Sequence, residues 1–153
     1  MSAKGKILGI YISHKRGIAK NSISCAQLIS DWGIRGDAHA GKWNKQICLF
    51  AIESLTEVPP TKWKQCQEKA HTENITIVGL SLEHLSPKTL LKIGHQVILR
   101  IESRGKEKFI EDGRSYIISR EGRFCTVLHG GQINVGDKIE KMTISEYEEF
   151  LHH

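Results

Sequence analysis

The chain has 153 residues, of which 39% are hydrophobic and 25% are charged, and this suits one domain that buries its own core. Its 22 Lys and Arg exceed its 17 Asp and Glu, for a net charge of +5. The charges form no long block of one sign, which favours a small anionic ligand over a dedicated nucleic-acid surface. There is no secretory pattern and no apolar run near the roughly 20 residues that span a bilayer, so we expect a cytoplasmic protein with no membrane or nucleic-acid partner.

The first third of the sequence predicts short strands separated by polar loops. Residues 6–13 are rich in β-branched and aromatic side chains and predict a strand, followed by a basic loop over residues 14–21. Residues 25–30 predict a second short strand. The continuous apolar run over residues 46–52 suits a strand that is buried on both faces, with Glu53 at its end.

The middle of the sequence is interrupted by a proline pair, after which residues 61–70 predict a short helix. Alternating side chains over residues 73–79 predict a strand, and residues 82–91 predict a loop with one helical turn. Residues 93–101 carry the clearest alternation in the chain and predict a single continuous strand.

The last third begins with a charged, glycine-punctuated stretch, residues 104–114, which predicts a loop. Residues 122–128 and 138–142 predict strands on either side of two glycine turns. The spacing of Thr143 and Glu146 is that of a capping box, and it predicts a short terminal helix that runs from Glu146 to Leu151.

These elements add up to about seven to nine short strands at intervals of roughly 10 residues. We therefore expect a mostly β fold, a barrel or sandwich with a few short helices, in one domain over residues 1–153. Cysteine spacing does not match a zinc site and predicts reduced, mostly buried, unreactive thiols. The four cysteines are Cys25, Cys48, Cys66 and Cys125.

The stretch over residues 33–42 is dense in glycine and in polar side chains that suit a binding site. Gly36 permits a positive φ, Arg35 offers a fork for anions, Asp37 an acceptor and His39 a titrating imidazole. An ordinary surface turn, with Asp37 bonded to its own backbone and His39 structural, is the alternative reading. Further polar residues stand at predicted strand ends, where a barrel would bring them to one mouth: Glu53, Glu73, Asn74, Lys106, Lys108, Arg120 and Glu121.

The order of these motifs resembles a known family. From about residue 7 to residue 139, the sequence reads in turn Gly-Asp-Ala-His-Ala-Gly at 36–41, Gln46, Glu53, Glu-Asn-Ile at 73–75, Arg-Gly-Lys-Glu at 104–107, Arg-Glu-Gly at 120–122, and Val-Gly-Asp at 135–137. This set is similar to the standalone type of the MOSC family, the molybdenum cofactor sulfurase C-terminal domain. The resemblance implies a barrel-like domain linked to molybdenum cofactor or sulfur delivery, with a molybdoenzyme or sulfurtransferase as partner and with pyridoxal phosphate as a family association.

The sequence departs from that family at the position that would carry its chemistry. Standalone members usually have a cysteine shortly after the Gly-Lys-Glu turn, and we align that position with Lys108. A lysine ammonium neither ligates molybdenum nor carries a persulfide. A Schiff base between Lys108 and pyridoxal phosphate is not expected either, because nothing here resembles the full sulfurase domain.

The resemblance and its departures lead us to expect a binding domain for molybdenum cofactor or a related anionic or sulfur-carrying ligand. Cations at motif positions would meet its phosphate: Arg35, Lys106, Lys108 and Arg120. Glu73, Asn74 and Gln46 would meet the polar edge of its ring. Two alternatives stay open: a molybdenum-dependent reductase or sulfur transferase, and a regulatory or interaction module that has lost the ligand.

Overall fold

The computed structural model of the chain describes residues 4–64, 71–105 and 118–152. The predicted Lys106 and Lys108 sites and most of the predicted loop over residues 104–114 therefore lie outside the described residues. The described strands are β1 (Lys4–Ile12), β2 (Asn21–Ile23), β3 (Cys25–Ile29), β4 (Gly33–Ile34), β5 (Ile47–Ala51), β6 (Ile75–Val78), β7 (Leu90–Ile93), β8 (Val97–Arg104), β9 (Arg123–His129), β10 (Gly131–Asn134) and β11 (Lys138–Met142). The described helical elements are the 3₁₀ turns η1 (Ile52–Glu57), η2 (Pro60–Lys62) and η3 (Ile118–Glu121), and the helix α2 (Ile144–Leu151).

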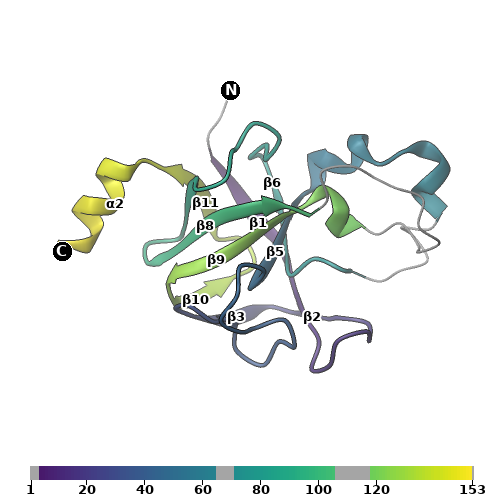
Figure 1. Cartoon of the computed structure of the whole chain (residues 1–153), viewed down its shortest axis with the longest axis horizontal. Helices are drawn as coiled ribbons and strands as arrows, with labels where there is room; N and C mark the ends of the chain where they lie inside the picture. The colour runs from purple at the N-terminus through teal and green to yellow at the C-terminus, as the bar shows by residue number, and fades with distance from the viewer. Residues whose placement is uncertain (1–3, 65–70, 106–117, 153) are drawn as a thin grey trace.

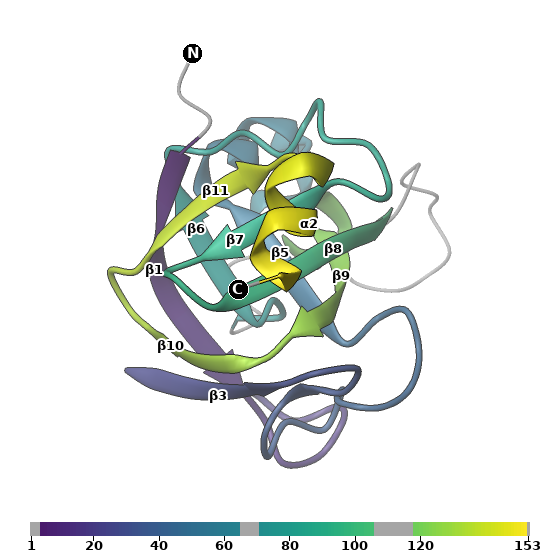
Figure 2. The same cartoon turned by 90° about the vertical axis from the view of Figure 1, so that its left-hand side faces the viewer.

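Seven strands close into a barrel, as Figures 1 and 2 show. Their order is β11, β7, β8, β9, β5, β6 and β1, and β11 pairs with β1 to complete the ring. The β5–β6 pair is parallel, with Leu49 opposite Ile75. The predicted mostly β barrel is therefore confirmed, and the start of β5 lies beside the start of β6.

A second, three-stranded sheet of β10, β3 and β4 lies below the barrel in Figure 2. Gly131 of β10 pairs with Leu28, and Leu28 in turn pairs with Ile34 of β4. This sheet delivers the stretch that follows Ile34 to the start of β5 and β6. None of the described helices is long and apolar enough to cross a membrane.

The barrel core consists of aliphatic side chains from every strand of the ring. In β1, Ile7 and Ile10 are almost fully buried and lie on either side of a register irregularity between Ile7 and Gly9. All five residues of β5 are buried, as the apolar run predicted, because strands lie on both sides of it and further elements cover both faces. Burial of this apolar surface supplies the main driving force that holds the ring together.

The prediction of a strand over residues 93–101 is confirmed for residues 97–101, which lie in β8, but its start is wrong, because Ile93 ends β7 and residues 94–96 form a turn between the two strands. Gly94 has a φ of +62°, a left-handed conformation that suits glycine, and the chain reverses there from β7 into β8. Ile98 is also buried although it points away from the barrel interior, because it packs with Leu90 and Met142 under Phe150 of α2. β2, β4, η1 and most of β7 are short elements that the sequence patterns did not indicate, and the helical turn predicted within residues 82–91 is not formed.

The predicted capping box is confirmed. The Thr143 hydroxyl accepts a hydrogen bond from the Glu146 backbone N–H (3.1 Å), and the Glu146 carboxylate accepts one from the Thr143 N–H (2.9 Å). The helix begins at Ile144, two residues before the predicted start, because Thr143 is its N-cap. For the helix predicted over residues 61–70, the structure describes η2 and the two residues after it, and residues 65–70 lie outside the described part.

Candidate functional site

Asp37 lies at the centre of a buried polar network. Gly36, with a φ of +85°, turns the chain so that the next side chain points into the protein. The Asp37 carboxylate accepts hydrogen bonds from the backbone N–H of Ser13 (3.1 Å), the backbone N–H of His39 (3.2 Å) and the side-chain amide of Asn74 (3.2 Å). Both carboxylate oxygens therefore hold the Gly-Asp-Ala-His-Ala-Gly loop against the barrel.

Lys20 completes this network, and the sequence analysis did not single it out. Its side chain is only 5% exposed, and its Nζ lies 3.7 Å from Asp37 Oδ1 and 3.3 Å from His39 Nδ1. The surrounding sequence is typical of a basic, solvated loop. Because the burial of Lys20 depends on tertiary packing, the sequence carried no signal for it. Burial lowers the pKa of His39, the positive charges of Lys20 and Arg16 lower it further, and Asp37 opposes them.

Asn74 joins the loop to two barrel strands. Its Oδ1 accepts a hydrogen bond from the backbone N–H of Cys48 (2.9 Å), and its Nδ2 donates to the carbonyl of Tyr11 (3.2 Å) as well as to Asp37. Asn74 is 2% exposed. The amide is thus committed to holding β1, β5 and the loop together.

Glu73, the next residue back along the chain, has a different environment. The residue is 1% exposed, its Oε2 accepts a hydrogen bond from the Thr76 hydroxyl, and the same oxygen lies 3.4 Å from Nδ1 of His71. Its Oε1 has no hydrogen-bond partner among the described residues. The ring of His71 stacks on Tyr11, with centroids 3.6 Å apart, and burial together with the Glu73 charge raises the pKa of Tyr11. This leaves a buried carboxylate oxygen that can accept a hydrogen bond.

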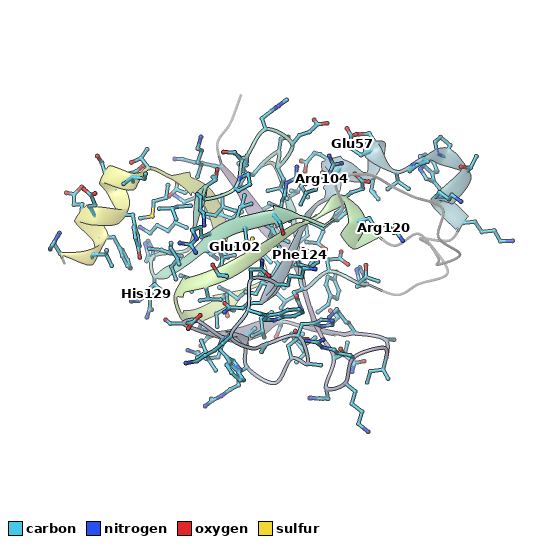
Figure 3. The ribbon with its side chains drawn as sticks, viewed as in Figure 1. Glu57, Glu102, Arg104, Arg120, Phe124 and His129 are labelled. Carbon is cyan, nitrogen blue, oxygen red and sulfur yellow. The ribbon has the colours of Figure 1, made fainter. Side chains whose placement is uncertain are left out.

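A second polar cluster surrounds the start of β9. Arg120 and Glu121 are buried on η3, and Glu121 accepts a charge-assisted hydrogen bond from Arg104 (2.7 Å). Arg123, which the sequence analysis did not select, donates to the carbonyl of Leu82 (3.0 Å) and is also buried. Burial lowers the pKa of Arg123, as does the neighbouring Arg104. Figure 3 shows Arg104 and Arg120 at the end of the barrel away from His129.

The two clusters lie at different points along β5. Asn74 bonds to Cys48, whereas Arg123 pairs with the next residue, Leu49, and η3 of its cluster contacts both β5 and the η1 turn that follows β5. Phe124, which pairs with Cys48, has the ammonium of Lys45 5.2 Å from its ring centre, and Figure 3 labels it near the middle of the barrel. The predicted site residues therefore form two groups along one strand.

Three other predicted residues have distinct places. Gln46 is fully buried, accepts from the Val127 N–H (2.9 Å) and donates to Asp31 (3.2 Å), so its amide is used within the protein. Glu53 is exposed and accepts from the N–H of Gly79 (2.7 Å) beyond the ends of β5 and β6, at the opposite end of these strands from Asn74. Arg35 is exposed at the start of the Gly-Asp-Ala-His-Ala-Gly loop.

The described thiols do not adjoin an activating base. Cys48 and Cys125 are buried, and burial raises the pKa of both, that of Cys48 to about 12. Cys25 is exposed on β3, so it departs from the expectation of mostly buried cysteines, and Cys66 lies outside the described residues. Within residues 4–64, 71–105 and 118–152, no three His, Cys, Asp or Glu side chains are grouped to hold a metal ion.

Comparison with known proteins identifies the fold. No family model matches the sequence, and no curated protein matches it. Among solved structures, YuaD from Bacillus subtilis is 18% identical with a TM-score of 0.64, over 90% of this chain and 95% of that one. YiiM from Escherichia coli is 13% identical with a TM-score of 0.64, over 93% of this chain and 71% of that one. YiiM from Geobacillus stearothermophilus is 14% identical with a TM-score of 0.60, over 97% of this chain and 84% of that one. YuaD and YiiM are MOSC-domain-like proteins, so this chain has a MOSC-like fold.

Proposed function

We propose that this MOSC-like domain binds a phosphorylated, pterin-like molybdenum cofactor, or an anionic ligand of related chemistry, without cysteine-dependent catalysis. The buried carboxylate of Glu73 carries the proposal. A buried carboxylate oxygen without a donor is costly, and a ligand that brings N–H groups to Glu73 Oε1 would remove this cost. The edge of a pterin ring carries such N–H groups.

The roles of the neighbouring side chains follow from their contacts. Asn74 and Gln46 have their amides engaged with backbone groups, so in this proposal they hold the site in shape and Glu73 contacts the ring. Glu73 and His71 face each other at 3.4 Å. When His71 donates from Nδ1 to the carboxylate, it keeps the negative charge of Glu73 in place for a ligand donor.

The anionic part of the ligand would lie at the cationic positions. Arg35 is exposed beside the Gly-Asp-Ala-His-Ala-Gly loop, and Arg120 belongs to the cluster farther along β5. Guanidinium groups bind phosphate through two parallel hydrogen bonds. Arg35 beside the loop and Arg120 in the second cluster therefore offer two cationic positions for the anionic part of a ligand whose ring edge lies at Glu73. Lys106 and Lys108 are proposed to add charge on the basis of the sequence alone.

The donor set fits the organic and anionic parts of such a cofactor better than its metal. The described residues supply a carboxylate, amides and guanidinium groups, and the buried Cys48 and Cys125 thiols have raised pKa values that disfavour the thiolate. When bound, a molybdenum cofactor supplies redox chemistry at its metal. This chain's residues are proposed to bind and orient the ligand for a molybdoenzyme or sulfurtransferase partner in the cytoplasm, and no role for pyridoxal phosphate is proposed.

A matched pair of carboxylate variants tests this proposal. Binding of a metal-free phosphorylated pterin is titrated by fluorescence with the wild type, Glu73→Gln and Glu53→Gln. A hydrogen bond to a charged partner contributes about 1.5 to 3 kcal/mol, so Glu73→Gln should weaken binding about tenfold to a hundredfold. Glu53, which bonds to Gly79 at the opposite end of the strands, should be replaceable without loss. Wild-type protein that does not bind, or two variants that bind equally, would contradict the proposal.

A further inference from the structure

The contact between Lys20 and His39 assigns a protonation state to the imidazole. Lys20 Nζ lies 3.3 Å from His39 Nδ1. A lysine ammonium has three donors and no acceptor, so the ring nitrogen that faces it must offer a lone pair. We propose that Lys20 is a positioning residue that holds His39 as a neutral imidazole with its proton on Nε2, so that the loop offers an N–H donor to an anionic oxygen.

Asp37 does not take the role that a carboxylate usually has beside a histidine. Its Oδ2 is 3.8 Å from His39 Nδ1, beyond hydrogen-bond distance, and accepts instead from the His39 backbone N–H at 3.2 Å. In the common pairing of carboxylate and histidine, the carboxylate accepts the proton on Nδ1 and leaves Nε2 free as a base. Here Lys20 faces Nδ1, so Nδ1 is the acceptor and Nε2 carries the proton, which is the reverse of the common pairing.

The charges around the ring favour its neutral form. Lys20 and Arg16, both from the loop between β1 and β2, oppose an imidazolium, whereas Asp37 from the histidine's own loop favours one. Burial opposes the imidazolium as well, and the net effect lowers the pKa of His39. An imidazolium would also place two cations 3.3 Å apart. The hydrogen-bond geometry and the electrostatics therefore both favour a neutral His39 imidazole.

Trp43 bonds to the backbone of the histidine, and Arg16 lies over the Trp43 ring. The indole N–H of Trp43 donates to the His39 carbonyl (2.9 Å), and the guanidinium of Arg16 lies 4.8 Å from the centre of the Trp43 ring. The side chain of His39 is still 36% exposed, so the imidazole is open to solvent in part. A neutral Nε2–H can donate to a phosphate or carboxylate oxygen, but it cannot ligate a metal or accept a proton. The inference rests on the proposed function only for the identity of that acceptor.

Nitrogen NMR of the full chain tests the tautomer directly. In ¹⁵N-histidine-labelled protein at pH 7, His39 should show a protonated Nε2 and an unprotonated Nδ1, with His39→Gln identifying its signals. Lys20→Met should raise the pKa of His39 and weaken the preference for this tautomer. Lys20→Arg, which keeps a donor-only cation, should retain it. Lys15→Met removes the same charge from an exposed position of the same loop and should leave the tautomer unchanged.

Each result bears on the inference. A proton on Nδ1, or an imidazolium at pH 7, in the wild type overturns it, as does a pKa of His39 that Lys20→Met leaves unmoved. If Lys20→Met does not fold, the wild-type tautomer and Lys20→Arg still decide the matter. Inorganic phosphate should shift the Nε2 resonance of His39 in the wild type, and a tautomer that is present but insensitive to phosphate overturns the assigned acceptor. The Glu73 titration does not depend on this measurement, so the two proposals can fail separately.

Discussion

Asp37 and Asn74 are joined by a buried hydrogen bond of 3.2 Å between a carboxylate oxygen and a side-chain amide. One residue comes from the loop after β4 and the other directly precedes β6, so the bond fastens the loop to the barrel wall. Because Asn74 also bonds to Cys48 and Tyr11, the loop's position is tied to the register of β1, β5 and β6. The Gly-Asp-Ala-His-Ala-Gly loop is thus part of the barrel's hydrogen-bond framework.

Replacing Asp37 should destabilise the fold strongly. In Asp37→Asn the nearly buried Lys20 ammonium loses its counter-ion, and breaking such a pair costs about 3 to 5 kcal/mol. The free energy of unfolding from urea denaturation measures this loss. Glu140→Gln, which removes partly exposed ion pairs with Lys138 and Lys4, is the control and should change stability by less than about 1 kcal/mol. Equal effects of the two variants would show that the Asp37 network contributes little to stability.

Variants of Asn74 should separate a lost hydrogen bond from added charge. Asn74→Ala leaves the buried Cys48 N–H without its acceptor and should cost about 1 to 3 kcal/mol. Asn74→Asp keeps the shape but places a second carboxylate against Asp37, so the two repel when both are ionised. Its stability relative to the wild type should therefore recover toward acid pH, whereas that of Asn74→Ala should not. Parallel pH profiles for the two variants would contradict this.

The lowered pKa of His39 predicts a pH dependence with a definite sign. In the unfolded chain the imidazole binds a proton below about pH 6.5, whereas in the folded protein it resists protonation to lower pH. The unfolded state thus binds more protons in this window, and the free energy of unfolding falls as the pH drops below about 6.5. His39→Gln keeps an acceptor for Lys20 and cannot titrate, so its stability should decline less between pH 7 and pH 5. A steeper decline for His39→Gln than for the wild type would reverse the assigned sign.

Thiol labelling should follow burial. At pH 7.5, iodoacetamide should modify Cys25, which is exposed, and leave Cys48 and Cys125 unmodified until the protein unfolds. Peptide mass spectrometry after timed labelling gives the rate at each position. Rapid modification of Cys48 in the folded protein, above all below neutral pH, would reveal an activated thiol and reopen the catalytic alternative.

Strand positions were predictable where the determinant is local. The apolar run at β5, the β-branched stretch of β1 and the capping box of α2 each carry their cause within a few residues. The β7–β8 turn was missed because apolar residues flank Gly94 on both sides and hide the reversal within a strand-like pattern. Alternation alone does not distinguish one long strand from a tight hairpin.

The site was predictable as a set of residues but not as a network. Asp37 was selected for its residue type, yet Ser13 and Asn74, which bind it, are 24 and 37 positions away along the chain. Lys20 escaped notice because only the folded chain buries it. Glu53 and Glu73 look equivalent at strand ends in the sequence, and the parallel register of β5 and β6 places them at opposite ends.

Native mass spectrometry of the chain isolated from its own cells tests the central claim most directly. We expect a wild-type species whose mass exceeds that of the chain by that of a phosphorylated pterin-like ligand, released on unfolding and absent from Glu73→Gln but kept by Glu53→Gln. A wild-type chain that carries no such ligand, or a ligand retained equally by Glu73→Gln, would contradict it.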